Sequence, residues 1–377
     1  MLRLASLVLC SAVLIGGTYV VRTSGTPVLP DTPYDYEGIE LPSHLQENWV
    51  VKWDNTPDDN PITNAGATLG RVLFYDTRLS LNETVSCATC HRQENGFSDP
   101  RPLSEGFEGE FTERHSMALG IARYDSNRRF FWDGRARTLE ELALVPIQDP
   151  IEMGMTLEGL TARLEATPFY SDLFADAFGT AEITPDRVSR ALAQFIRSIV
   201  STNSRYDAAR LEPGTTLGRP LAGLTEQENQ GLQVFFGRGC TSCHVGDLFV
   251  GTGFTNNGLD STLTDPGAFI GRFKTVSLRN IGLTAPYMHD GRFATLEDVV
   301  NHYSSGVQHS PGLDMRLLGR DGGPIRMNFS DEEKAALVAF LHTLTDTTLA
   351  TDPRWSNPFT AEADGDTSDG ESPEAGR

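Results

Sequence analysis

Two five-residue segments decide the fold: Cys87-Ala88-Thr89-Cys90-His91 and Cys240-Thr241-Ser242-Cys243-His244. Each has the Cys-x-x-Cys-His form to which c-type haem is attached. On one helical turn, both sulfurs can form thioethers to the haem vinyl groups, while the following imidazole reaches the iron from the same face. About 0.001 such segments are expected by chance in a chain of this composition. The pair therefore predicts two covalently bound c-type haems.

The spacing of the cysteines argues against their other common uses. Zinc sites built from two Cys pairs usually place about 15–20 residues between the pairs, whereas 149 residues (91–239) intervene here. A thioredoxin-like redox pair needs a βαβ setting, which this sequence lacks. The fifth cysteine, Cys10, leaves no further pair for a disulfide.

The sequence around the two segments repeats a simple order. A Gly-Arg dipeptide follows each segment after a long irregular stretch, once in Trp132-Asp133-Gly134-Arg135 and once in His289-Asp290-Gly291-Arg292. Alternating strand patterns are scarce. Helix periods with start signals are clear in three segments: 184–199, 225–236 and 330–341. The sequence predicts a mainly α protein with an N-terminal haem domain, 61–210, and a C-terminal haem domain, 211–350.

The two ends of the chain differ from this body. Residues 4–21 form an uncharged apolar stretch near the length of a membrane helix. Residues 1–22 are therefore predicted to be either a signal peptide or a retained anchor, with export to the periplasm in both cases and tethering to the inner membrane in the second. Residues 23–60, rich in Pro, Thr, Asp and Asn, are predicted to be a flexible tether. Residues 351–377 are predicted to be an acidic disordered tail.

The formal net charge of −20 limits the partners of the protein. A chain this acidic is a poor match for nucleic acid or an anionic lipid surface, so no nucleic-acid partner is expected. A small basic donor protein suits the charge better.

Four further stretches make the sequence resemble the bacterial di-haem cytochrome c peroxidase and MauG family, from about residue 69 to residue 344. They are FWDGRA (131–136), PIQDPIEM (146–153), FKTVSLRN (273–280) and APYMHDG (285–291). The resemblance implies two cytochrome c-like helical domains packed face to face. It also implies a peroxide-binding, high-spin haem on His91 and an electron-donating haem on His244.

Several residues match functional positions of that family. Trp132 matches the tryptophan that relays electrons between the haems, and Glu152 matches the glutamate that takes a proton from hydrogen peroxide and returns it to the departing oxygen. The resemblance also implies a calcium ion, for which Thr284 and Pro286 match two backbone carbonyl ligands. His115 stands at the position of the third ligand, an Asn, although calcium prefers oxygen ligands.

Two departures from the family pattern concern the first haem. Phe107 stands sixteen residues after His91, where reductively activated members carry a histidine ligand. Phenylalanine cannot bind iron, so the resemblance implies a five-coordinate or water-bound iron that needs no preactivation, with His115 as the alternative ligand. Leu142 stands ten residues after Trp132, where a glutamine is common near the peroxide site.

A third departure concerns the second haem. Tyr303 stands fourteen residues after His289, where peroxidases of the family often place a methionine and MauG-type members place a tyrosine. Tyr303 is therefore predicted to be the axial ligand of the His244 haem, which lowers its reduction potential because a phenolate stabilises the ferric state relative to a thioether. The alternatives are a hydrogen-bonded Tyr303 with another ligand on the iron: His302, Met288 or Met315.

These residues support a leading function and two alternatives. The leading prediction is a di-haem c-type peroxidase that reduces hydrogen peroxide to water. Its electrons come from a small donor protein of the cytochrome c or cupredoxin type, or from a quinol. The alternative enzyme is a MauG-like oxidase that acts on a protein or small molecule, which Phe107 and Tyr303 favour. The alternative of another class is a non-enzymatic di-haem electron-transfer cytochrome. A homodimer is left open.

Overall fold

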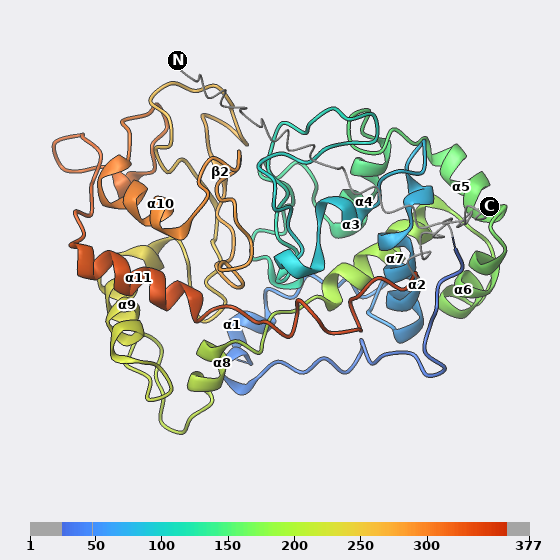
Figure 1. Cartoon of the computed structure of the whole chain (residues 1–377), viewed down its shortest axis with the longest axis horizontal. Coiled ribbons are helices and arrows are strands. Elements are labelled where there is room, and N and C mark those ends of the chain that lie inside the picture. The colour runs from blue at the N-terminus through green and yellow to red at the C-terminus, as the bar shows by residue number, and fades with distance from the viewer. Residues whose placement is uncertain (1–24, 47, 360–377) are drawn as a thin grey trace, which may run out of the picture.

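One pair of long helices builds each half of the molecule. In this computed structural model, which describes residues 25–46 and 48–359, α2 (Asn64–Tyr75) packs on α7 (Pro185–Ser198), and α9 (Glu226–Gly237) packs on α11 (Asp331–His342). The first pair belongs to the first half (61–210) and the second pair to the second half (211–350). Figure 1 shows the two halves side by side along the long axis.

Both helix pairs approach closely because each has a glycine at the contact. A Cβ atom at Gly70 in α2 would overlap the carbonyl oxygen of Ala191 in α7. A Cβ atom at Gly231 in α9 would overlap the carbonyl oxygen of Ala336 in α11 in the same way. In both halves, a glycine therefore allows the two long helices to pack closely.

The remaining helices are shorter and the described strands are minimal. The other α-helices are α1 (Asn48–Val51), α3 (Cys87–Cys90), α4 (Leu139–Gln148), α5 (Leu157–Glu165), α6 (Pro168–Phe178), α8 (Arg205–Arg210) and α10 (Leu296–Asn301). Short 3₁₀ turns are η1 (Ser43–Leu45), η2 (Thr77–Leu79), η3 (Gln93–Asn95), η4 (Ala122–Tyr124), η5 (Cys240–Ser242) and η7 (Met315–Leu317), and a π-helical turn spans His302–Gly306. Strands β1 (Phe254–Thr255) and β2 (Phe273–Lys274) pair antiparallel, with Phe254 opposite Lys274. The predicted mainly α class is confirmed.

The three helices with clear start signals begin where their caps predict. The side-chain oxygens of Thr184, Thr225 and Ser330 accept hydrogen bonds from the backbone N–H three residues later, at the starts of α7, α9 and α11. Each cap satisfies an N–H group that the first turn of a helix leaves without a partner. Local sequence therefore sets these boundaries.

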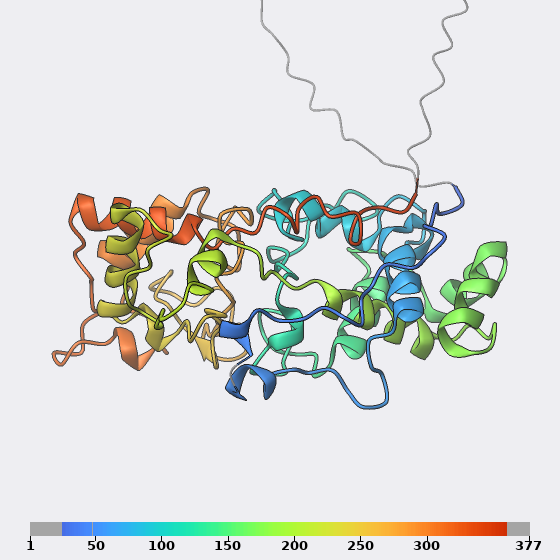
Figure 2. The ribbon, with the colours of Figure 1, turned by 90° about the horizontal axis from the view of Figure 1, so that it is seen from below.

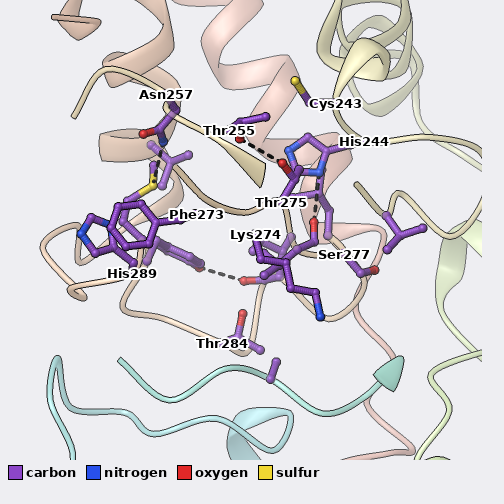
Figure 3. A pocket seen from close by; sticks show the side chains of 18 of the residues that line it. Cys243, His244, Thr255, Asn257, Phe273, Lys274, Thr275, Ser277, Thr284 and His289 are labelled. Atoms are coloured by element: carbon purple, nitrogen blue, oxygen red, sulfur yellow. Dashed lines mark hydrogen bonds between the residues drawn. The ribbon is translucent and has the colours of Figure 1, made fainter. Parts of the chain in front are cut away.

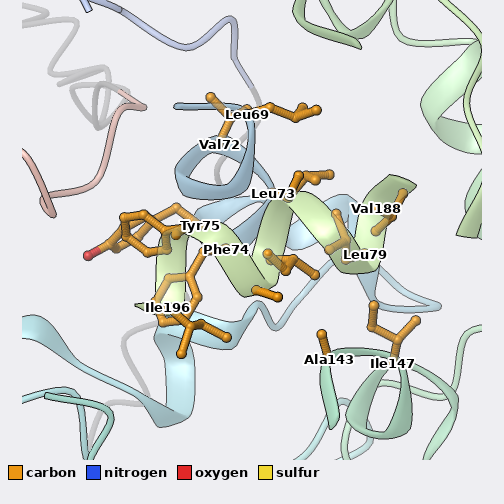
Figure 4. Close-up of a cluster of buried hydrophobic side chains, with 14 of the residues drawn as sticks. Leu69, Val72, Leu73, Phe74, Tyr75, Leu79, Ala143, Ile147, Val188 and Ile196 are labelled. Carbon is orange, nitrogen blue, oxygen red and sulfur yellow. The ribbon is translucent and has the colours of Figure 1, made fainter. Parts of the chain in front are cut away.

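The first hydrophobic core lies where α2, α4 and α7 meet (Figure 4). Leu73 and Phe74 of α2 are fully buried there, against Val188 and Ile196 of α7 and Ile147 of α4. Burying each such side chain stabilises the fold by about 1.5–3 kcal/mol. A second core joins α9 and α11 through Leu232, Phe235, Leu337, Phe340 and Leu341.

The described part of the predicted tether, residues 25–46 and 48–60, is packed rather than free. Leu45 and Val50 are fully buried, in a cluster with Leu248 and Val250 of the second half. The His44 ring lies 2.8 Å from a carboxylate oxygen of Asp207. The few apolar residues of this segment follow no period, so their burial depends on partners far away in the sequence.

The described part of the predicted disordered tail, residues 351–359, returns to the first half. Trp355 and Phe359 are buried in the first core. The Tyr75 hydroxyl donates to the Trp355 carbonyl at 2.6 Å, and the Tyr36 hydroxyl donates to the Arg354 carbonyl at 2.6 Å. Figure 2 shows the N-terminal segment running along the long axis across the junction of the halves, and the chain after α11 crossing it to reach the first half.

The predicted signal peptide or anchor, 1–22, and residues 360–377 lie outside the described residues. Within the part of the chain that the structure describes, none of the helices has the length and apolar character needed to cross a membrane.

Candidate active site

The first haem segment lines a cavity of about 570 Å³ in the first half. Cys87 and Cys90 lie on the single turn α3, and His91 follows it directly. The Nδ1 atom of His91 donates to the Phe97 carbonyl at 3.0 Å. A carbonyl can only accept, so Nδ1 carries the proton and Nε2 is left for a metal.

The second haem segment lines another cavity, of about 480 Å³, whose lining comes from the second half and in part from the first. Cys240 and Cys243 belong to the turn at η5, and His244 follows. Its Nδ1 atom donates to the Val276 carbonyl at 3.1 Å, with the Phe249 carbonyl at 3.3 Å (Figure 3). The second imidazole is therefore oriented in the same way as the first.

The cysteines in these cavities fit covalent haem and not zinc. The two Cys pairs line different cavities, and all four thiols are free. Burial raises the pKa of the Cys87, Cys90 and Cys240 thiols to about 12. The residues present thus suit two thioether bonds and one imidazole ligand in each cavity.

Glu152 lies on the wall of the first cavity, in a turn that follows α4. The Asp149 carboxylate accepts the backbone N–H groups of Ile151 at 2.8 Å and of Glu152 at 3.1 Å, which fixes this turn. Burial raises the pKa of Glu152 to about 7, and the nearby Asp149 carboxylate adds to the shift. A carboxyl group with this pKa can both accept and return a proton near neutral pH.

Trp132 lines both cavities. Its indole N–H donates to the His115 carbonyl at 2.7 Å, and its own carbonyl accepts from the Lys274 backbone N–H at 2.8 Å. These two bonds hold the indole at the wall that the cavities share.

Tyr303 lines the second cavity from the π-helical turn that follows α10. Its hydroxyl lies 3.4 Å from the side-chain amide nitrogen of Asn257. Burial raises the pKa of Tyr303 to about 12, and the Asn257 hydrogen bond opposes the shift. A phenol oxygen is therefore available in the same cavity as His244.

The other predicted ligands of the second haem divide into two groups. Met288 lines the cavity with Tyr303. His302 is not among the cavity-lining residues, and its Nε2 atom bonds the Asn257 carbonyl at 3.0 Å. Met315 is 81% exposed and also lies outside the cavity lining. The structure thus brings Tyr303 and Met288 to the site, and not the other two.

Comparisons with known proteins identify the family. A family model for di-haem cytochrome c peroxidase matches residues 64–213. The methylamine utilization protein MauG of Methylorubrum extorquens is 34% identical over 355 residues, covering 90% of this chain and 94% of that protein. The cytochrome c551 peroxidase of Nitrosomonas europaea is 33% identical, covering 74% of this chain and 79% of that protein. The chain belongs to the di-haem cytochrome c peroxidase and MauG family.

A solved structure supports the same assignment. The crystal structure of a MauG-like protein associated with microbial copper homeostasis is 35% identical, with a TM-score of 0.69 over 81% of this chain and 96% of that one. Family membership implies two c-type haems and an oxidoreductase function. Relatives carry both the MauG and the peroxidase name.

The departures predicted to concern the first haem are Phe107 and Leu142, with His115 as the alternative ligand. Phe107 does not line either cavity, and its ring packs against Gly154 beside the first core. Leu142 lines both cavities. His115 also lines both, but its Nε2 atom lies 3.1 Å from the Ser98 hydroxyl and its Nδ1 atom lies 3.1 Å from the Arg101 carbonyl. Both ring nitrogens of His115 are therefore engaged away from a haem iron.

The calcium ion of the family stays a prediction for this chain. Thr284 and Pro286 lie on the wall of the second cavity. The ring of His115, at the predicted position of the third ligand, faces the carbonyls of Arg101 and Pro102 as a hydrogen-bond donor. In the described ranges, no cluster of three His, Cys, Asp or Glu side chains could hold a metal ion. Calcium has no part in the proposed chemistry.

Sequence reasoning missed two polar residues of the second cavity. Asn257 belongs to the long irregular stretch before β2 and carries no motif of its own. Lys274 lies within the family stretch 273–280, which was the available signal. It is buried and paired with Asp125, and burial lowers its pKa to about 7.

Proposed function

We propose that this protein reduces hydrogen peroxide at the His91 haem with electrons that enter through the His244 haem. One observation carries the proposal. Glu152 lines the first cavity with His91, and the other histidine that lines this cavity, His115, has both ring nitrogens in hydrogen bonds. Among the described residues, the lining of this cavity therefore offers no histidine to close the distal side of the first iron. It also supplies a proton carrier there, as peroxide chemistry requires.

The residues of the first cavity have separate parts in this reaction. A bound c-type haem supplies an iron that binds peroxide and changes its oxidation state. The Phe97 carbonyl orients the His91 ring through Nδ1. The Glu152 carboxylate accepts a proton from hydrogen peroxide and returns it to the oxygen that departs as water. Leu142, Pro146 and Ile151 form an apolar wall that limits bulk water.

Trp132 connects the two cavities in this proposal. Two cytochrome c-like domains packed face to face bring their haems to opposite sides of one indole, and the lining of both cavities by Trp132 supports this arrangement. An indole can pass an electron or hold a radical between two irons. Trp132 is thus proposed as the relay.

Tyr303 favours a MauG-like use of this chemistry. As the axial ligand of the His244 haem, a phenolate lowers the reduction potential and stabilises the oxidised iron. Held by His244 and Tyr303, a haem of this kind would supply an oxidant for a protein or small-molecule substrate. This oxidase is the second candidate, and the relatives named cytochrome c551 peroxidase favour the peroxidase proposed first.

The cellular setting and partners belong to the same proposal. The protein is exported to the periplasm and accepts electrons from a small donor protein or a quinol. The acidic chain, with a net charge of −20, favours a basic donor such as a small cytochrome.

Peroxide titration of the purified ferric protein tests the proposal. A high-spin component that reacts with hydrogen peroxide supports it, whereas a purely low-spin spectrum that peroxide does not change supports an electron-transfer cytochrome. Steady-state assays with reduced cytochrome c and with a quinol then separate the two enzymes. Rapid oxidation of cytochrome c indicates the peroxidase, and peroxide-reacted protein that persists in its presence indicates the MauG-like oxidase.

A further inference from the structure

Asn257 contacts the two candidate ligands of the second haem that line its cavity, Tyr303 and Met288. Its side-chain amide nitrogen lies 3.4 Å from the Tyr303 hydroxyl oxygen and 3.4 Å from the Met288 sulfur. In Figure 3, its side chain extends from the segment after β1 towards the cavity that His244 lines. A primary amide carries two N–H donors, so one donor is available for each acceptor.

The backbone around Asn257 is held on several sides, so the position of its amide is set in advance. The neighbouring Asn256 is buried, and its side chain bonds Ser310, the carbonyls of Ile270 and Pro311, and the Gly258 N–H. The Asn256 carbonyl accepts from the Asp314 N–H at 2.9 Å, and the Gly258 carbonyl accepts from the Gln308 N–H at 2.8 Å. Gly258 adopts a φ of 71°, which favours glycine.

Tyr303 is held from its own side. It lies in the π-helical turn His302–Gly306, which directly continues α10. Such turns are rare and occur often at functional sites. The preceding residue, His302, bonds the Asn257 carbonyl through Nε2 at 3.0 Å. The Asn257 and Tyr303 segments are thus joined twice, once through the side chain of Asn257 and once through its backbone.

We propose that Asn257 is the positioning residue of the second haem, with its amide N–H donating to the iron-bound oxygen of Tyr303. The inference rests on the proposed function, in which Tyr303 binds the His244 haem. The bond fixes the direction of the oxygen and withdraws electron density from it. Its other N–H acts on the Met288 sulfur only weakly, because a neutral thioether is a poor acceptor, whereas a charged phenolate is a strong one.

This role has a defined electronic consequence. A phenolate that loses its N–H donor gives more electron density to the iron and stabilises the ferric state further. The potential of the second haem therefore depends on Asn257 as well as on Tyr303, as expected for groups that hydrogen-bond to metal ligands.

Three variants of the full-length di-haem protein test the inference. Asn257→Leu keeps the approximate shape and removes the donor, Asn257→Gln keeps an amide, and Met288→Leu removes the other acceptor. We measure haem content by mass, the phenolate-to-iron charge-transfer band of the ferric protein, and the midpoint potential of the second haem. In Asn257→Leu we expect a shifted band and a lower potential. Asn257→Gln is expected to restore part of both, and Met288→Leu to match the wild type.

Two results would overturn the inference. The first is an Asn257→Leu protein with two haems and an unchanged band and potential. The second is a Met288→Leu protein that shows the same shift as Asn257→Leu, or a thioether band in Asn257→Leu, because the amide would then act through Met288. The proposed function fails separately, by the absence of any peroxide reaction in the wild type. The assignment of Tyr303 fails if Tyr303→Phe leaves the band unchanged.

Discussion

The two halves of the molecule build their cavities with matching elements. α4 begins after Thr138, four residues beyond Gly134, and α10 begins after Thr295, four residues beyond Gly291. Both threonines cap their helix through the side-chain oxygen. The chain before each cap closes with an isolated antiparallel bridge, Phe130 with Ala136 and Tyr287 with Phe293. Helix pairing, haem segment and cap therefore repeat from one half to the other.

The halves differ in the segment that directly follows α4 in the first half and α10 in the second. α4 ends at Gln148 and a tight turn brings Glu152 to the first cavity, whereas α10 continues into a π-helical turn that brings Tyr303 to the second. Glu152 offers a carboxyl group whose pKa is raised to about 7, and Tyr303 offers a phenol oxygen. A few residues at the end of one helix thus give two similar haem sites different chemistry.

The largest expected effect is on the midpoint potential of the second haem, when its proposed ligand Tyr303 is replaced. Replacing Tyr303 by Met substitutes a thioether for the phenolate, so we expect the midpoint potential of the second haem to rise by about 0.2 V, a quarter of the ~0.8 V range that axial ligands span. This equals about 4.6 kcal/mol, since 59 mV corresponds to a tenfold change. Redox titration measures it. Tyr287→Phe is the control, because the Tyr287 hydroxyl donates to the Ile281 carbonyl in the same half. An unchanged potential in Tyr303→Met would contradict the ligand assignment.

The next effect concerns the proton carrier of the first half. Replacing Glu152 by Gln is expected to slow the reaction with peroxide by ~10²-fold or more, because the amide cannot accept the proton. The pKa of Glu152 is raised to about 7, so its base form increases as the pH rises through this value. We expect the wild-type rate to rise over the same range and the variant rate to stay flat. Stopped-flow kinetics measure both, with the exposed Glu110→Gln as control. Equal rates in wild type and Glu152→Gln would remove this role.

A smaller effect is expected at the wall that the halves share. Replacing Trp132 by Phe should lower steady-state turnover by about tenfold, or about 1.4 kcal/mol, while the first reaction with peroxide keeps its rate. The matched control is Trp355→Phe, which changes a buried tryptophan whose indole donates to Ser198 at 3.2 Å, in the first core. If turnover in Trp132→Phe equals that of the control, electrons cross between the halves by another route.

The smallest effect tests the shared scaffold. In Gly70→Ala and Gly231→Ala the new Cβ overlaps a backbone carbonyl. Overpacking costs about 1–3 kcal/mol and the gain in helix propensity returns about 1 kcal/mol, so we expect a net loss of about 1 kcal/mol in each half. Thermal unfolding measures the loss. Gly237→Ala, at the end of α9 with no neighbour within 4 Å, serves as control and should not lower the melting temperature. A loss in one half only would break the equivalence of the two helix pairs.

The sequence predicted the parts of the molecule that depend on local chemistry. The haem segments are read from cysteine and histidine spacing, and Thr184, Thr225 and Ser330 mark helix starts through short-range caps. The family stretches led to Glu152 and Trp132. Asn257 could not be predicted, because its contact with Tyr303 requires an irregular loop to pack against a helix 46 residues away. The burial of Leu45 was missed for the same reason.

The two packed end segments make the haem halves inseparable. Leu45 and Val50 pack into a cluster with Leu248 and Val250 of the second half, and Trp355 and Phe359 are buried in the first core. The N-terminal segment therefore packs on the second half, and the C-terminal segment completes the core of the first half. A protease nick in the exposed connection at residues 211–220 would leave two fragments that remain bound and melt in one calorimetric transition. Neither fragment, expressed by itself, would have a complete interior.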